Sequence, residues 1–386
     1  MGLVKSDWME AQERGWSAPE TYVCADCVED PYLKQQIDQA KCASTCDYCG
    51  RKADMPIAAP TEVVVEVVFG AVRAYYCEPS AGGVPYDQGF IVEPIAIEEV
   101  LDHLGFDGHP DLVEAVADSE INGDMFVPAA NGYWADVHPH QALSYAWRHF
   151  VHVVKHETRF HFAHRLNDDD DGTDEIAVAR TLPALVEWLR PLVRTLPKGT
   201  QVHRTRLRKR GETWTPTAEA MGAPPPDKTS AGRMNPPGIP YFYGSFDKAT
   251  ARREVGITGR TSRTVYSAMF ELATPLVVVD LTQLPAVPSV FDVASKDDRE
   301  QALFVRQFVD EISVPVTKDG QEHIEYVPTQ VVCEYLAQVF EPRPGTRLGG
   351  LVFPSSVHLG GKNLVVFPDD RYAGSYRSLA FVRTGK

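Results

Sequence analysis

The sequence lacks the patterns that mark several common protein classes. Its 386 residues contain no apolar run that approaches the length needed to span a bilayer, and the N-terminal segment lacks the apolar stretch of a signal peptide. No GxGxxG motif follows a predicted strand, and there is neither a GxxxxGK loop ending in Ser or Thr nor a GxSxG elbow. We therefore expect a cytoplasmic protein without a membrane partner. The missing motifs argue against Rossmann, P-loop and α/β-hydrolase folds.

Basic residues are also scarce relative to acidic ones. The chain has 38 Lys and Arg against 53 Asp and Glu, which gives a net charge of −15 at pH 7. So acidic a chain does not attract the phosphate backbone over a broad surface, and we do not expect nucleic acid as its main partner. The length is sufficient for two or three domains with a large core.

Five of the seven cysteines lie between residues 24 and 49. Four of them form a CxxC…CxxC pattern with 18 residues between the pairs: Cys24, Cys27, Cys46 and Cys49. Two such turns can direct four thiolates toward one ion, and a closed tetrahedron of sulfur ligands leaves no open position. The pattern predicts a structural Zn²⁺ site. Cys42 is either a competing ligand or a bystander.

Residues 57–165 have mainly helical patterns. Apolar residues at helical spacing follow Thr61, and shorter amphipathic pieces cover 97–104 and 111–117. The strongest apolar stripe lies within 139–164, which we predict to be one helix.

This last segment carries five histidines: His149, His152, His156, His161 and His164. A metal site would use His152 and His156, one helical turn apart, with a third ligand. A ribonuclease of the HEPN type would use the Rx4–6H pattern from Arg159 to His164. The favoured interpretation is that Lys155, His156 and Arg159 make packing and interface contacts.

The most distinctive stretch is Gly232–Val255, which reads GRMNPPGIPYFYGSFDKATARREV. Its Gly/Pro loop is followed by an aromatic segment suited to a strand. Asp247 then suits the N-cap of a short helix that ends near Glu254. Such a unit can place an arginine, a tyrosine and a carboxylate around one cleft.

Short strands dominate the remainder of the C-terminal half. We predict strands at 201–207, 240–244, 264–271, 275–280, 350–356, 363–368 and 378–383, and helices at 247–256, 298–311 and 329–340. Upstream, the acidic block 167–174 is a predicted linker, and 182–196 is a predicted helix.

These motifs resemble the RES domain, which is named after an arginine, a glutamate and a serine. Gly232–Val255 follows the family's central signature, and the segment VHRTR supplies Arg204. Glu254 is the matching glutamate. The segment GLVFPSS, followed by GGKNL, supplies Ser355, with Ser356 as its rival. The resemblance covers residues 198–386.

A looser resemblance covers the N-terminal half. The cysteine pattern, the PYDQG loop and the segment VVKHETRFHF resemble the HEPN-like domain that accompanies some RES domains. We therefore expect an α+β chain with four parts: a zinc-ribbon-like segment at 1–55, a helical HEPN-like domain at 56–165, a linker and connecting helix at 166–200, and a RES domain at 201–386. The resemblance implies that the RES domain has an ADP-ribosyltransferase-like mixed β core with short helices.

The RES resemblance further implies NAD+ as substrate and cleavage of its nicotinamide–ribose bond. The transition state of that reaction carries positive charge on the ribose, so it needs a nearby carboxylate, a cation for the diphosphate and an aromatic surface. The implied catalytic residues are Arg204, Glu254, Ser355 and Tyr243. Arg233, Asn235 and Ser356 are the implied cofactor-binding residues.

Several functions remain open at this stage. The chain could be a toxin-like NAD+ glycohydrolase or phosphorylase, with water or phosphate as acceptor, or an ADP-ribosyltransferase that modifies a protein. A dimeric HEPN ribonuclease with an accessory RES domain and a non-catalytic zinc-ribbon adaptor are the alternatives. The resemblance also implies an antitoxin or regulatory partner, and a homodimer is a further expectation.

Overall fold

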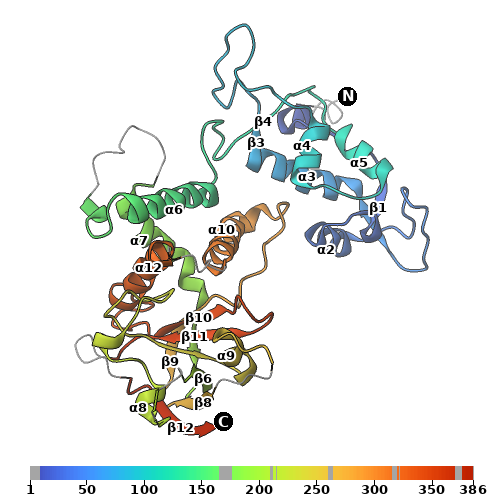
Figure 1. Cartoon of the computed structure of the whole chain (residues 1–386). Coiled ribbons are helices and arrows are strands. Elements are labelled where there is room, and N and C mark those ends of the chain that lie inside the picture. Colours follow the sequence, from blue (N-terminus) through green and yellow to red (C-terminus); the bar gives the residue numbers. More distant parts are fainter. Residues whose placement is uncertain are drawn as a thin grey trace. The chain divides into compact units, whose positions relative to one another are not determined.

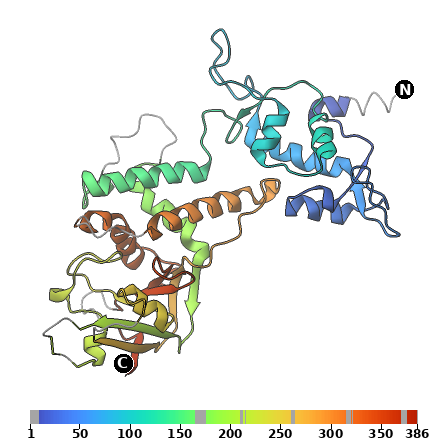
Figure 2. The same cartoon turned by 45° about the vertical axis from the view of Figure 1, so that its right-hand side comes forward.

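The computed structural model describes residues 9–164, 176–208, 212–213, 215–259, 264–314, 320, 322–369 and 376–385. The chain forms two compact units (Figures 1 and 2). The first contains Met1–Pro139 and Ala286–Ala302, and the second contains His140–Pro285 and Leu303–Lys386. The predicted acidic linker at 167–174 lies outside the described residues.

The first unit is mainly helical. Its elements are β1 (Tyr22–Cys24), the 3-10 helix η1 (Ala25–Cys27), α2 (Pro31–Ala40), β2 (Ala58–Pro60), α3 (Thr61–Tyr75), β3 (Tyr76–Cys77), α4 (Ile97–Leu104), α5 (Pro110–Ala117), β4 (Val127–Pro128) and η5 (Val293–Ser295). In α3, Val64, Val65, Val68 and Val72 are buried in one stripe, as the helical spacing predicts. The same core includes Phe291 from the later segment of this unit.

The second unit is built on an eight-stranded sheet with the order β12-β8-β6-β7-β11-β10-β9-β5. The strands are β5 (Val193–Leu196), β6 (Gln201–Leu207), β7 (Phe242–Ser245), β8 (Val265–Leu272), β9 (Leu276–Asp280), β10 (Gly350–Pro354), β11 (Lys362–Val366) and β12 (Leu379–Gly385). Neighbouring strands are antiparallel except β9 and β10. The sheet is therefore mixed, and seven of its strands match predicted ones.

Helices of this unit are α6 (Pro139–His156), η2 (Phe162–His164), α7 (Val178–Leu189), η3 (Arg190–Leu192), α8 (Ala218–Met221), η4 (Pro226–Lys228), α9 (Lys248–Glu254), α11 (Glu322–Glu325) and α12 (Val327–Gln338). The helix α10 (Lys296–Ser313) contains the boundary between the units. The helices α6, α7 and α12 gather on one side of the sheet (Figures 1 and 2).

Both faces of the sheet are buried, since adjacent strand residues belong to different cores. Val279 and Leu351 pack with the helices, whereas Val278 and Val352 pack with Met221 on the other face. A polar side chain at the centre of the sheet must therefore be hydrogen-bonded or face a cavity, because burying it without a partner costs free energy.

Two predicted helices are shorter than expected. The helix predicted at 182–196 ends at Leu189, and β5 follows because its backbone pairs with β9 after Pro191. The helix predicted to reach His164 ends at His156. There the N–H groups of Glu157 and Thr158 both donate to the carbonyl of Val153. Among the described residues, no helix has the length and apolar character to cross a bilayer.

Candidate active site

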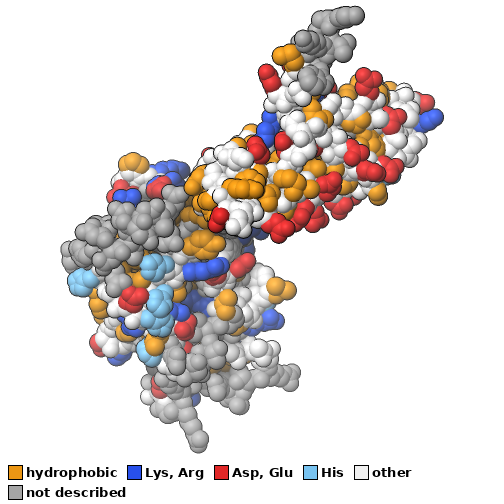
Figure 3. Space-filling model, turned by 90° about the horizontal axis from the view of Figure 1, so that it is seen from above, with side chains coloured by type: hydrophobic (Ala, Val, Ile, Leu, Met, Phe, Trp, Pro, Cys, Tyr) orange, Lys and Arg blue, Asp and Glu red, His pale blue; other side chains and the backbone are white. Residues whose placement is uncertain are grey.

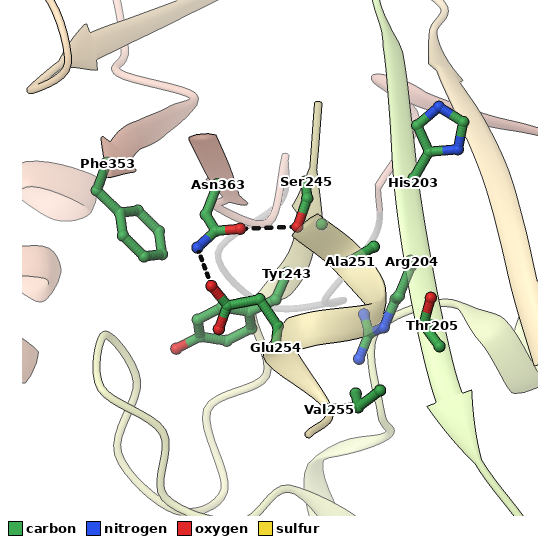
Figure 4. Close-up of a pocket in the computed structure, with 11 residues that line it drawn as sticks. His203, Arg204, Thr205, Tyr243, Ser245, Ala251, Glu254, Val255, Phe353 and Asn363 are labelled. Carbon is green, nitrogen blue, oxygen red and sulfur yellow. Dashed lines mark hydrogen bonds between the residues drawn. The ribbon is translucent and has the colours of Figure 1, made fainter. Parts of the chain in front are cut away.

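A cavity of about 200 Å³ opens between β6, β7, β11 and α9 (Figure 4). Its lining consists of His203, Arg204, Thr205, Tyr243, Gly244, Ser245, Ala251, Glu254, Val255, Phe353 and Asn363. Three of the four predicted catalytic residues, Arg204, Tyr243 and Glu254, therefore line one cavity. The sheet brings them together from segments about 50 residues apart.

Glu254 is positioned by the short helix α9. The Asp247 side chain caps this helix by accepting the Thr250 N–H at 2.8 Å, and Glu254 is its last residue. The Glu254 carboxylate is exposed, yet one of its oxygens is held firmly. Its Oε1 accepts from Ser355 Oγ and from Asn363 Nδ2, both at 2.6 Å. No described residue donates to Oε2, so this oxygen is free for a ligand.

Asn363 connects Glu254 to the buried centre of the sheet. It lies directly opposite Ser245 in the β7–β11 pair, and its Oδ1 accepts the Ser245 hydroxyl at 2.7 Å. Only 2% of Ser245 is exposed. This bond fixes the amide so that its nitrogen faces Glu254, as Figure 4 shows. Neither Asn363 nor Ser245 is a predicted site residue, although Asn363 lies in the quoted GGKNL segment.

Arg204 supplies a cation that has no carboxylate partner among the described residues. Its Nη1 is buried and has no hydrogen-bond partner among the described residues. The guanidinium carbon lies 5.1 Å from the centre of the Phe242 ring. Burial, and next the charge of Arg206, lower the pKa of Arg204 to about 9, so the guanidinium remains protonated near pH 7. Arg204 forms no ion pair with Glu254, and an anionic ligand would satisfy its free Nη1.

Tyr243 contributes its ring to the cavity rather than a free hydroxyl. The hydroxyl donates to Asn235 Oδ1 at 2.7 Å and accepts the Met234 N–H at 3.1 Å. Burial raises the pKa of Tyr243 well above its ordinary value. The phenol is therefore neutral, and its ring forms a flat surface of the cavity that is held in place by these hydrogen bonds.

The predicted cofactor-binding residues lie outside this cavity. Asn235 is buried, and its amide donates to the carbonyls of Ser230, Pro236 and Ile239, so it organises the Gly/Pro loop. Arg233 donates to two carbonyls at the end of α10, those of residues 312 and 314, both at 3.1 Å. The Gly/Pro loop thus holds Tyr243 through its hydroxyl, and the side chains of Arg233 and Asn235 are already hydrogen-bonded within the protein.

The two serines after β10 differ in position. Ser355 contacts Glu254, whereas Ser356 is exposed and does not line the cavity. Their loop is tied to α9, because His358 Nδ1 lies 2.6 Å from Thr250 Oγ1. A Cβ on Gly361 would lie 2.5 Å from the same Thr250 oxygen, so an alanine here would force the loop or the Thr250 side chain to move.

The four cysteines of the CxxC pairs come together in the first unit. The Sγ atoms of Cys24 and Cys27 are 3.7 Å apart, and the Cys24–Cys49 and Cys27–Cys46 sulfurs are each 3.6 Å apart. A tetrahedral ion with bonds of about 2.3 Å would place its sulfurs roughly 3.8 Å apart. The Cys24 N–H also donates to Cys46 Sγ at 3.3 Å. The geometry fits a tetrahedral metal ion, whereas Cys42 is exposed outside the cluster.

The histidines of α6 form no comparable group. Among the described residues, the four cysteines are the one cluster of suitable donors within reach of a common ion. The His152 and His156 rings are 5.3 Å apart, and His152 Nε2 lies 3.2 Å from Glu157 Oε1. Histidine side chains lie exposed on the face shown in Figure 3. The side chain of His164 lies outside the described residues.

Comparison with known proteins identifies both halves of the chain. Residues 39–168 match the family model "HEPN/RES N-terminal domain 1", and residues 201–381 match the model "RES domain". The protein therefore combines a HEPN/RES N-terminal domain with a RES domain, as the motifs predict.

The chain is also similar to a solved structure. A chain of the M. tuberculosis MbcT–MbcA toxin–antitoxin complex is similar to this chain, with 15% identity and a TM-score of 0.28. The similarity covers 52% of this chain and 90% of that chain. No curated protein matches the sequence.

Proposed function

We propose that the RES domain cleaves the bond between nicotinamide and ribose in NAD+. The proposal rests on the way the Glu254 carboxylate is hydrogen-bonded. One oxygen is held by Ser355 and Asn363, while the other is free at a cavity that also contains a cation and a tyrosine ring. Membership of the chain's second half in the RES family supports NAD+ as the substrate class.

The proposed roles follow from the charges that change during the reaction. Nicotinamide leaves as a neutral base from a cationic pyridinium, so no strong acid is needed. Positive charge develops on the ribose, and the fixed carboxylate of Glu254 stabilises it without having to reorganise. The hydrogen bonds to Oε1 direct Oε2 toward the ribose, where it can also accept from a ribose hydroxyl.

Arg204 and Tyr243 position the substrate in this proposal. The free Nη1 of Arg204 binds a phosphate oxygen, and its buried surroundings strengthen that interaction. The Tyr243 ring packs against the nicotinamide or the ribose. The cavity is smaller than the roughly 300 to 1,000 Å³ of typical small-molecule sites. It therefore holds the nicotinamide ribose and the adjoining phosphate, and the remainder of the dinucleotide lies along the surface.

The acceptor of the ADP-ribosyl group defines the finer activity. We propose water or phosphate as the acceptor, and the alternative is a protein side chain. We also propose a toxin-like role held in check by an antitoxin or regulatory protein, and that the mixed sheet is an ADP-ribosyltransferase-like core. These proposals are supported by membership in the RES family.

The test is to incubate the full-length protein with NAD+ and to measure nicotinamide release by chromatography. Mass analysis of the second product, with and without added phosphate, identifies the acceptor. Glu254→Gln keeps the hydrogen-bonding shape but removes the charge, and we expect it to lose at least about 100-fold in rate, the scale of a lost electrostatic contact to a transition state. Ser356→Ala is the matched control, since Ser356 lies outside the cavity. Equal rates for wild type and Glu254→Gln would exclude the proposed role.

We further propose that the four clustered cysteines bind a structural Zn²⁺. The sulfur separations and the CxxC spacing support this assignment. All four sulfurs would be ligands, so the ion would connect η1 to the turn at residues 46–49. Its contribution would be to the stability of the first unit, with no step in NAD+ cleavage.

A further inference from the structure

A second cavity lies in the second unit, apart from the NAD+ cavity. Its volume is about 700 Å³, and it shares no lining residue with the first. It runs between α12, the segment that follows α6 and the Gly/Pro loop. Most of its surface is apolar, with Phe162, Val331, Tyr335 and Pro236 among the lining residues. This volume falls within the range of roughly 300 to 1,000 Å³ that ligand sites occupy. We refer to it as the α12 groove.

The groove contains a carboxylate without a partner among the described residues. Glu334 lies on α12 between apolar neighbours, it is half-buried, and no described residue forms a hydrogen bond or ion pair with it. Burial raises the pKa of Glu334. Two other carboxylates of this unit form ion pairs: Glu325 pairs with Lys155 at 2.7 Å, and Glu187 pairs with Arg190 at 2.6 Å. A partly desolvated, unpaired carboxylate is best satisfied by a cation that enters the groove.

Part of the apolar lining of the groove is open to solvent. Phe160 is 87% exposed and Val339 is 57% exposed, and both line the groove. A small molecule inside the cavity would leave these side chains in water. A polypeptide segment would cover them while it inserts one side chain toward Glu334. The extent of the surface therefore favours a protein ligand.

We propose that the α12 groove binds a segment of a partner protein. This segment places one arginine or lysine against Glu334 and flanks it with apolar side chains that cover Phe160 and Val339. Arg159, which is exposed and also lines the groove, can bind an acidic group beside the basic one. The ligand class is thus a basic residue within an apolar sequence.

The α12 groove is next to the Gly/Pro loop, which holds Tyr243 in place at the NAD+ cavity. Gln330, which lines the groove, donates to the carbonyls of Gly232 and Asn235 at 2.8 and 3.0 Å. Asn235 in turn accepts the Tyr243 hydroxyl. A ligand in the groove therefore contacts the loop that fixes Tyr243. We expect its binding to change the rate of nicotinamide release, and this part rests on the proposed function.

The experiment uses the full-length protein and three capped five-residue peptides. Their sequence is leucine, phenylalanine, a variable residue, leucine and phenylalanine, where the variable residue is arginine, norleucine or glutamate. Ligand-observed NMR titrations measure each dissociation constant for wild type, Glu334→Gln and Glu334→Lys. Asp227→Asn is the matched control, because it removes one charge from an exposed carboxylate that does not line the groove. Near-UV circular dichroism verifies that each variant is folded.

We expect wild type to bind the arginine peptide about tenfold more tightly than the norleucine peptide, which corresponds to roughly 1.4 kcal/mol for a charge-assisted contact. Glu334→Gln should remove this preference, Glu334→Lys should transfer it to the glutamate peptide, and Asp227→Asn should leave it unchanged. Equal binding of the arginine and norleucine peptides to wild type would overturn the site. So would a preference that survives in Glu334→Gln. An unchanged rate of nicotinamide release at saturating peptide, in an active enzyme, would overturn the link to Tyr243 alone.

Discussion

Replacing Asn363 with alanine tests how much the positioning of Glu254 contributes to the rate, because the carboxylate itself remains. The change removes the 2.6 Å hydrogen bond to Glu254 Oε1, while Ser355 and the carboxylate itself remain. Glu254 is exposed, so solvent weakens this bond, and we assign it about 1 to 1.5 kcal/mol rather than the upper value for charged partners. If the whole contribution is made in the transition state, kcat falls about tenfold.

The same substitution has a second effect on the buried sheet. The Ser245 hydroxyl loses its acceptor, and an unsatisfied buried hydroxyl costs about 1 to 3 kcal/mol of folding free energy. Removing that hydroxyl as well, in the double variant Ser245→Ala with Asn363→Ala, should restore most of the stability. The rate should stay low, because the contact with Glu254 is still missing.

Two assays on the same three proteins therefore distinguish the two effects. Nicotinamide release gives kcat, and urea unfolding gives the free energy of unfolding. The reasoning is refuted if Asn363→Ala keeps the wild-type kcat. It is also refuted if the double variant recovers the rate together with the stability, since the loss would then come from the fold and not from Glu254.

Three further predictions concern other parts of the chain. Removing one of the proposed zinc ligands, in Cys46→Ser, should lower the bound zinc measured by mass spectrometry from one ion per chain to well below one and destabilise the first unit, whereas Cys42→Ser should match wild type. For Asp247, burial opposes ionisation, but the hydrogen bonds from Thr250 and the Ala249 N–H outweigh it and lower the pKa. Because the folded-state pKa of Asp247 is lowered, its ionised carboxylate stabilises the fold above the unfolded pKa of about 3.9. This contribution is lost as pH falls through the folded-state pKa. Thermal unfolding should therefore show a smaller acid sensitivity below about pH 4 in Asp247→Asn than in wild type, and identical curves would contradict this. Gly361→Ala should displace the loop from Thr250 and lower kcat by several-fold with little change in folding free energy, and a wild-type rate would show that the loop tolerates the methyl group.

The sequence predicts which residues lie close together where short local patterns specify the strand and the helix that carry them. Arg204 and Glu254 line the same cavity because β6 and α9 form as the local patterns predict. The strand pattern around Arg204 and the helix cap before Glu254 depend on short-range interactions, which can be predicted from the local sequence. The cysteine spacing is equally local, and the four sulfurs converge as expected.

The sequence is less informative where a side chain depends on distant partners. Arg233 and Asn235 lie in the same signature as Glu254, yet their donors are occupied by carbonyls, and the cavity lies on the other side of Tyr243. The role of Asn363 depends on its register opposite Ser245, more than 100 residues earlier. Strand β5 likewise forms only because β9 offers an edge, so its helical pattern was misleading.

Strand β6 has a neighbouring strand along each side, and this limits which insertions the RES domain can accept. It pairs with β8 over seven consecutive residues and meets β7 at His203. Because side chains alternate across a strand, a slip by one position would exchange Arg204 for its neighbour His203 or Thr205. Insertions should therefore be tolerated in the connections between strands, whereas a residue added within β6 before Arg204 would shift this arginine from its place in the cavity.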